Sequence, residues 1–138
     1  MKRQRAFSLI EMILVVVIIG LLATLVLPKF LGWGERGRKA AASAQVSSLK
    51  TSLQHFHLAC GRRPTTEEGL EALVTRPAGL DEDVKWEKTL DGAVPADPWG
   101  RDYIYRCPGT VNTDGFDLFS LGLDGVEGTD DDIGNTKP

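Results

Sequence analysis

Hydrophobic residues are concentrated near the N-terminus of the chain. The apolar run from Phe7 to Leu27 is interrupted only by Ser8, Glu11, Gly20 and Thr24. A helix over this run is about 31 Å long at 1.5 Å per residue, which matches a hydrocarbon core of roughly 30 Å. We therefore predict a membrane-spanning segment at residues 7–28, with one carboxylate, Glu11, close to its start.

The flanking residues favour a cytoplasmic N-terminus for this segment. Lys2, Arg3 and Arg5 precede the apolar run, which by the positive-inside rule favours this orientation, although basic residues also follow the run at Lys29, Arg36, Arg38 and Lys39. A secretory signal peptide is the alternative, and it needs an apolar region of about 7–15 residues that ends in an A-x-A-like site. The stretch "LLATLVLP" lacks such a pair of small residues, so we expect the whole segment to be retained.

Helical periodicity replaces the continuous apolar run after Pro28. Apolar residues recur at i, i+4, i+7, i+11, i+14 and i+18, at Ala42, Val46, Leu49, Leu53, Phe56 and Cys60. This seam predicts an amphipathic helix over residues 29–60. We expect it to continue the apolar helix and to pack against the C-terminal region, because a seam shorter than three heptads is too short for a free coiled coil.

The rest of the chain, residues 61–138, predicts a small α+β region. Gly61 ends the long helix, and Thr65 with Glu68 forms a capping box for a short second helix that extends to about Val74. Mostly loop follows from 78 to 100, with "PADPWG" as a compact turn. The runs "RDYIYRC" (101–107) and "GFDLFSLG" (115–122) predict an antiparallel pair of strands packed on the helical seam.

A glycine-rich acidic stretch, "LGLDGVEGTDDDIGN", occupies residues 121–135. Its carboxylates, at Asp124, Asp130, Asp131 and Asp132, repel one another unless a cation neutralises them. Calcium takes 6–8 oxygen ligands and suits such a loop, although the ligand spacing of an EF-hand is absent. The residues alone leave two interpretations open, and a solvated acidic turn is favoured over a bound cation.

The N-terminal stretch "RAFSLIEMILVVVIIGLLATLVLP" resembles the leader and first helix of type IV pilins and type II secretion pseudopilins. The shared pattern is a short basic leader, a small residue before the cut, Phe after it, and Glu at the fifth mature position, here Ala6, Phe7 and Glu11. The stretches "PTTEEGLEALV", "PADPWGRDY", "FDLFSLGLDG" and "DDDIGN" further resemble the major pseudopilins of type II secretion systems. The resemblance covers nearly the whole chain and implies a pilin-like α+β fold.

The resemblance also implies how the chain is processed and used. A prepilin peptidase removes residues 1–6 by cutting between Ala6 and Phe7, and it methylates the new N-terminus of Phe7. The subunits then polymerise into a periplasmic pseudopilus that drives protein export, with an inner-membrane assembly platform and minor pseudopilins as partners. The chain is expected to be a single-pass inner-membrane protein whose C-terminal domain lies in the periplasm.

Two kinds of site residue follow from the resemblance. The side chains of Asp124, Asp131 and Asp132 and the carbonyl oxygens of Leu121 and Val126 are expected to hold a structural calcium ion, with Asp130 pointing to solvent. After processing, Glu11 is expected to neutralise a terminal amine, most productively that of Phe7 in a neighbouring subunit, because an unpaired carboxylate inside a spanning helix costs about 2.5–3.5 kcal/mol or more. The two cysteines, Cys60 and Cys107, belong to no motif of this family resemblance. In the oxidising periplasm a disulfide between Cys60 and Cys107 is favoured over two buried thiols.

Other classes of function are less well supported. Nucleophile elbows, phosphate loops and recognisable pairs of His and acid are absent from the sequence, so an enzyme is not expected. Loss of the three basic leader residues leaves 13 basic against 19 acidic side chains, which disfavours binding to nucleic acid. The alternatives kept are a type IV pilin subunit for adhesion, motility or DNA uptake, and a solitary membrane-anchored calcium-binding module.

Overall fold

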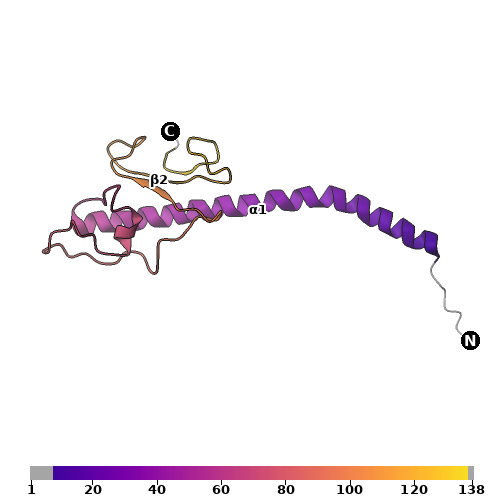
Figure 1. Cartoon of the computed structure of the whole chain (residues 1–138), viewed down its shortest axis with the longest axis horizontal. Helices are drawn as coiled ribbons and strands as arrows, with labels where there is room; N and C mark the ends of the chain where they lie inside the picture. Colours follow the sequence, from indigo (N-terminus) through magenta and orange to yellow (C-terminus); the bar gives the residue numbers. More distant parts are fainter. Residues whose placement is uncertain (1–7, 137–138) are drawn as a thin grey trace, which may run out of the picture. The chain divides into compact units, whose positions relative to one another are not determined.

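The computed structural model describes residues 8–136, and for residues 25–33 it describes the backbone alone. Its elements, in chain order, are the helix α1 (Leu9–Cys60), the 3-10 helix η1 (Leu70–Leu73) and the strands β1 (Ile104–Arg106), β2 (Asp117–Ser120) and β3 (Ile133–Gly134) (Figure 1). The chain divides into two compact units, Met1–Gly37 and Arg38–Pro138. The predicted leader at residues 1–6 and the predicted mature N-terminus, Phe7, lie outside the described residues.

The helix α1 includes both the apolar and the amphipathic segments, as the sequence predicts. At its start the Ser8 carbonyl accepts hydrogen bonds from the amides of Glu11 (3.0 Å) and Met12 (3.2 Å). At its end Gly61 takes a positive φ of 71°, and its amide donates to the carbonyl of His57 at 2.9 Å. Because glycine adopts this left-handed conformation without a steric penalty, it ends the helix at Cys60.

In the first unit, the described large apolar side chains from Leu9 to Leu22 are exposed. Within the described part of the chain, no helix has both the length and the apolar character needed to cross a membrane. The predicted span at 7–28 extends past these residues, since Phe7 and the side chains of 25–28 lie outside the description. It therefore stays a prediction.

The hydrophobic core lies in the second unit, along the predicted seam of α1. Val46, Leu49, Leu53 and Phe56 are each at most 3% exposed, and Cys60 is half-buried at the end of the row. Against them pack residues from η1, the following loop and the sheet, namely Leu70, Ala72, Leu73, Leu80, Tyr103, Tyr105 and Leu118. Burial of each large apolar side chain contributes about 1.5–3 kcal/mol, so the seam fixes the C-terminal region on the helix.

The sheet is antiparallel, with the strand order β1-β2-β3 among the described residues. Ile104 is paired with Phe119, and Phe119 in turn with Gly134, so β2 is the central strand. All four residues of β2 are buried. The two predicted strands are present but shorter than predicted, and β3 is an addition that the sequence pattern does not indicate.

The second helix is also shorter than predicted. The capping box forms: the amide of Thr65 donates to Glu68 Oε2 at 2.9 Å, and the amide of Glu68 donates to Thr65 Oγ1 at 3.2 Å. Gly69 then takes a φ of 59°, which a right-handed helix does not allow, and a regular 3-10 helix begins at Leu70. The left-handed Gly69 therefore limits the helix to four residues.

Side chains hold the long loop after η1 onto the core. The indole Nε1 of Trp86 donates to the carbonyl of Ala72 at 3.0 Å, and the Ser52 hydroxyl donates to the carbonyl of Thr89 at 3.3 Å. The amide of Thr89 donates to the carbonyl of Leu73 at 3.0 Å. The loop is thus ordered through hydrogen bonds to α1 and η1, because backbone groups outside a helix or sheet need other hydrogen-bond partners.

Candidate metal-binding loop

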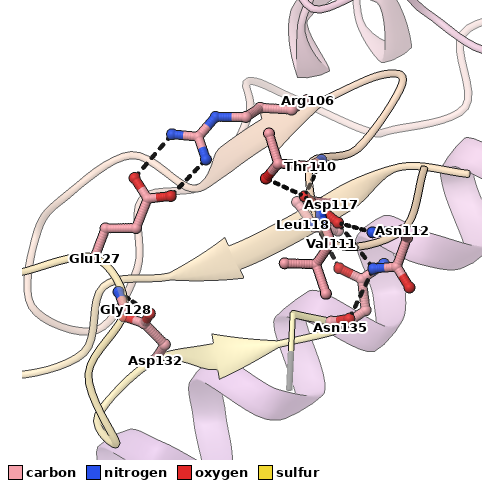
Figure 2. A network of polar contacts seen from close by, with 10 residues as sticks. All are labelled: Arg106, Thr110, Val111, Asn112, Asp117, Leu118, Glu127, Gly128, Asp132 and Asn135. Carbon is pink, nitrogen blue, oxygen red and sulfur yellow. Dashed lines mark hydrogen bonds and ion pairs between the residues drawn. The ribbon is translucent and has the colours of Figure 1, made fainter. Parts of the chain in front are cut away.

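A buried carboxylate, Asp117 at the start of β2, organises the loop between β1 and β2 (Figure 2). Its Oδ2 accepts hydrogen bonds from the amides of Thr110 (2.6 Å) and Val111 (2.9 Å) and from the Thr110 hydroxyl. Its Oδ1 accepts from the amide and the side-chain amide of Asn112. Burial alone raises the pKa of Asp117, but these donors outweigh burial and hold it well below its usual range.

Asn135 fastens the end of the described chain to β2. Its side-chain oxygen accepts a hydrogen bond from the amide of Leu118 (2.6 Å), and its side-chain nitrogen donates to the carbonyl of Phe116 (2.7 Å). Its own carbonyl accepts a hydrogen bond from the side-chain amide of Asn112, which also donates to Asp117 Oδ1 (Figure 2). The acidic stretch 121–135 therefore ends at a fixed point on the sheet.

The beginning of the acidic stretch is fixed by the turn "PADPWG". Asp97 is 5% exposed, and its Oδ2 accepts a hydrogen bond from the Ser120 hydroxyl at 2.5 Å. The Ser120 oxygen in turn accepts from the amide of Gly122 at 3.1 Å. Arg101, held by Asp97 Oδ1 through its amide (2.8 Å), donates to the carbonyls of Gly122 (2.6 Å) and Leu123 (3.3 Å).

The predicted ligands at the front of the stretch make local contacts. The carbonyl of Leu121 accepts a hydrogen bond from the amide of Gly125 (3.3 Å), and Asp124 Oδ1 accepts from the amide of Val126 (2.9 Å). The carbonyl of Val126 accepts from the Thr129 hydroxyl at 3.3 Å. The side chains of Asp124 and Val126 are exposed, so this part of the loop faces solvent.

Asp131 is engaged by a cationic side chain from α1. The ammonium Nζ of Lys39 lies 2.7 Å from Asp131 Oδ1, and this ion pair joins residues that are 92 positions apart. The Lys39 ammonium holds the pKa of the Asp131 carboxyl below its usual range, and backbone amides of Asp124 and Leu123 contribute in the same direction. Asp130, which the resemblance does not assign as a ligand, is exposed.

Asp132 is the buried carboxylate of the acidic stretch. Its side chain is 6% exposed, and its Oδ2 accepts a hydrogen bond from the amide of Gly128 at 2.7 Å. Its Oδ1 is buried and has no hydrogen-bond partner within the described part of the chain. Because a buried carboxylate oxygen without a partner is costly, a hard cation would stabilise it.

The donor set of the loop is chemically suited to calcium, since all the predicted ligands are carboxylate or carbonyl oxygens. In the arrangement described for residues 8–136, however, no three acidic, His or Cys groups lie close enough together to hold a metal ion. The stretch thus brings Asp124, Asp131 and Asp132 onto one loop with both ends fixed, and the calcium site stays a prediction.

The remaining predicted site residues lie elsewhere. Ala6 and Phe7 are outside the described residues, and Glu11 is exposed in the first turn of α1. Cys60 and Cys107 are both half-buried free thiols in the structure, and burial raises the pKa of Cys60. The disulfide between them stays a prediction.

Sequence reasoning omits Asp117, Arg101 and Lys39, which order the loop and its surroundings. Lys39 and Arg101 act over 92 and 21 positions, and no local spacing reports such contacts. Asp117 does carry a signal, because a carboxylate inside the strand-like run "GFDLFSLG" is expected to need hydrogen-bond donors when it is buried.

Comparison with known families assigns both parts of the chain. Residues 29–136 match the family described as type II secretion system (T2SS), protein G, and residues 1–27 match the prokaryotic N-terminal methylation motif. The first of these matches separates the chain from the type IV pilin alternative.

Individual proteins agree with the family match. The type II secretion system core protein G of Aeromonas hydrophila is 41% identical over 138 residues, which cover 97% of this chain and 93% of that protein. The protein of the same name from Escherichia coli is 40% identical, with 96% and 91% covered. The crystal structure of the major pseudopilin from the type 2 secretion system of enterohaemorrhagic Escherichia coli is similar with a TM-score of 0.64 and 35% identity, over 77% of this chain and 92% of that one. The chain therefore belongs to the protein G family of type II secretion system pseudopilins.

Proposed function

We propose that this chain is the major filament subunit of a type II secretion system, processed by a prepilin peptidase and polymerised into a periplasmic pseudopilus that drives protein export. The observation that carries the proposal is the pair of matches that together span the chain, a methylation motif at 1–27 and a protein G region at 29–136. In this role the peptidase cuts between Ala6 and Phe7 and methylates Phe7. The role is structural, and no residue is assigned to catalysis.

The proposed location is the inner membrane, with the C-terminal region in the periplasm. Lys2, Arg3 and Arg5 before the apolar run support this orientation. The exposed apolar side chains of α1 from Leu9 to Leu22 support the membrane location, because an apolar surface of this kind needs lipid or other copies of the helix to cover it. The proposed partners are other copies of the chain, the prepilin peptidase, an inner-membrane assembly platform and minor pseudopilins.

Expression of the full chain together with its matching peptidase and assembly proteins tests this function. We expect a product that begins at N-methylated Phe7 by mass spectrometry, and filaments by electron microscopy. The control omits the peptidase, and we expect it to give the intact precursor and no filaments. If the complete set of proteins yields neither cleavage nor filaments, the proposed function is wrong.

We also propose that the acidic loop holds a structural calcium ion. The side chains of Asp124, Asp131 and Asp132 and the carbonyl oxygens of Leu121 and Val126 would hold the ion, and the unpartnered Oδ1 of Asp132 supports this assignment. The ion would neutralise the clustered carboxylates and stabilise the loop against the sheet.

Thermal unfolding of the full chain in detergent micelles tests the calcium proposal. Calcium at about 100 times its Kd is expected to add roughly 2.7 kcal/mol of stability and to raise the Tm by several degrees relative to chelator. The substitution Asp124→Ala is expected to abolish the gain, whereas Asp91→Ala, an exposed acidic residue outside the loop, is expected to keep it. An equal Tm of the unchanged chain in calcium and in chelator would contradict the proposal.

A further inference from the structure

Two cationic side chains from outside the acidic loop contact it in different ways. Lys39, on α1, contacts a carboxylate oxygen of Asp131, one of the proposed calcium ligands. Arg101 contacts carbonyl oxygens of Gly122 and Leu123, neither of which is a proposed ligand. The two cations therefore bear differently on a metal ion in the same loop.

We propose that Lys39 competes with calcium for Asp131, whereas Arg101 positions the loop for calcium by holding the carbonyls of Gly122 and Leu123. The inference rests on the calcium proposal above and adds to it the regulation of that site by the chain's own charges. Calcium binding then exchanges one cation for another at Asp131, and it releases the Lys39 ammonium from this carboxylate.

The geometry at Asp131 supports competition. The Lys39 Nζ is 2.7 Å from Oδ1, so the ammonium already occupies the position in front of this oxygen from which a cation would bind it. Two positive charges close to one oxygen repel each other, and the repulsion is strong where water is scarce. The Lys39 side chain is 45% exposed, so its flexible stem can turn into solvent at a small cost.

The geometry at Arg101 supports a positioning role. Its amide is fixed by Asp97 Oδ1 at 2.8 Å, and its guanidinium is bidentate toward the carbonyls of Gly122 and Leu123. Gly125 lies against the guanidinium, since an added Cβ at this glycine would be 2.8 Å from Arg101 Cζ. Arg101 thus determines the path of the backbone between Leu121 and Val126, which carry the two proposed carbonyl ligands.

The two roles predict opposite effects when each charge is removed. Removal of any positive charge near the loop favours the binding of calcium, because it reduces the electrostatic repulsion of the ion. The substitution Lys39→Met also frees Asp131, so calcium is expected to bind about two- to fivefold more tightly, the range expected of a partly exposed ion pair. The substitution Arg101→Met removes the backbone support, so calcium is expected to bind more weakly despite the lost charge.

Calorimetric titration of calcium chloride into the full chain in detergent micelles measures these affinities. The control Lys88→Met removes an exposed charge outside the loop and is expected to change the Kd by less than the Lys39 variant does. Arg101→Lys retains the charge but not the bidentate geometry, and it is expected to weaken calcium binding as Arg101→Met does. In chelator, Lys39→Met is expected to lower the Tm and to speed hydrogen exchange in residues 121–132.

The outcomes separate this inference from the proposals on which it rests. Binding to the unchanged chain with an unaltered or weaker affinity in Lys39→Met overturns the competition and leaves the calcium site intact. Tighter binding in Arg101→Met overturns the positioning role. Lack of calcium binding in both the unchanged chain and Lys39→Met overturns the calcium site and this inference together, and filament formation tests the secretion role independently. Binding to Lys39→Met alone supports the competition.

Discussion

Asp117 shows how a single ionised residue can order a segment of this chain. Its folded-state pKa is depressed by donors from Val111, Asn112 and Thr110, which more than offset the effect of burial. A carboxyl of this kind contributes stability that is present above its unfolded pKa of about 3.9 and is lost as the pH falls toward its lower folded value. Acid is therefore expected to release the loop between β1 and β2.

The substitution Asp117→Asn tests this role. The amide presents an NH₂ group where the carboxylate presents an acceptor, so buried backbone amides lose a partner, and we expect a loss of about 1–3 kcal/mol at pH 7. Urea unfolding of the full chain in micelles at pH 7, 5 and 3 measures both this loss and its pH dependence. The variant is expected to lose less further stability between pH 5 and 3 than the unchanged chain.

The exposed Asp114 in the same loop supplies the control. We expect Asp114→Asn to keep nearly the full stability and the full pH dependence, because this side chain is on the surface. Equal acid sensitivity in the Asp117 and Asp114 variants would show that another group is responsible.

At the scale of elements, β3 depends on close backbone packing at Gly134. A Cβ added at this glycine would be 2.1 Å from the carbonyl oxygen of Leu118 and 2.4 Å from Cβ of Phe119. Contacts this short force the backbone to move. The third strand therefore requires glycine at this position.

The substitution Gly134→Ala is expected to separate β3 from β2 and to cost about 1–3 kcal/mol, as overpacking of a tight site does. Hydrogen exchange measured by mass spectrometry on the full chain in micelles is expected to show loss of protection at 117–120 and 133–135. The control is Gly115→Ala, where the nearest atom to an added Cβ is at 3.7 Å. If Gly134→Ala retains protection like the control, the packing argument is wrong.

The elements that sequence reasoning predicts well are those set by local patterns. The seam of α1 is confirmed because a period of 3.6 residues directly marks the buried face. The capping box at Thr65 and Glu68 forms, but the conformation of Gly69 shortens the helix that follows. The strand β3 is two residues long and is held partly by the side chain of Asn135, so it has no periodicity to detect.

At the scale of the whole molecule, the two units differ in how far their apolar side chains are buried. The second unit contains the core that folds the chain, whereas the described apolar side chains at the start of α1 are exposed. Changes in the first unit are therefore expected to affect assembly more than folding. Glu11, exposed within this apolar surface, is the residue to examine.

The substitution Glu11→Ala is expected to leave membrane insertion, cleavage and the Tm unchanged but to reduce filament assembly strongly. The reason is the predicted pairing: the methylated amine of Phe7 in a neighbouring subunit would lose its carboxylate partner in surroundings with little water. Electron microscopy in the filament experiment described above measures the effect. Glu11→Asp keeps the charge and is expected to retain more filaments than Glu11→Ala, and normal filaments from Glu11→Ala would refute the pairing.

The fixed ends of the acidic loop have a kinetic consequence. Ser120 and Arg101 hold its beginning and Asn135 holds its end, so the entropy of closing the loop is spent during folding. A calcium ion bound as proposed would therefore meet a short segment with few backbone conformations left to search. If calcium binds as proposed, its capture is therefore expected to need local rearrangement within the loop, and not the folding of a segment.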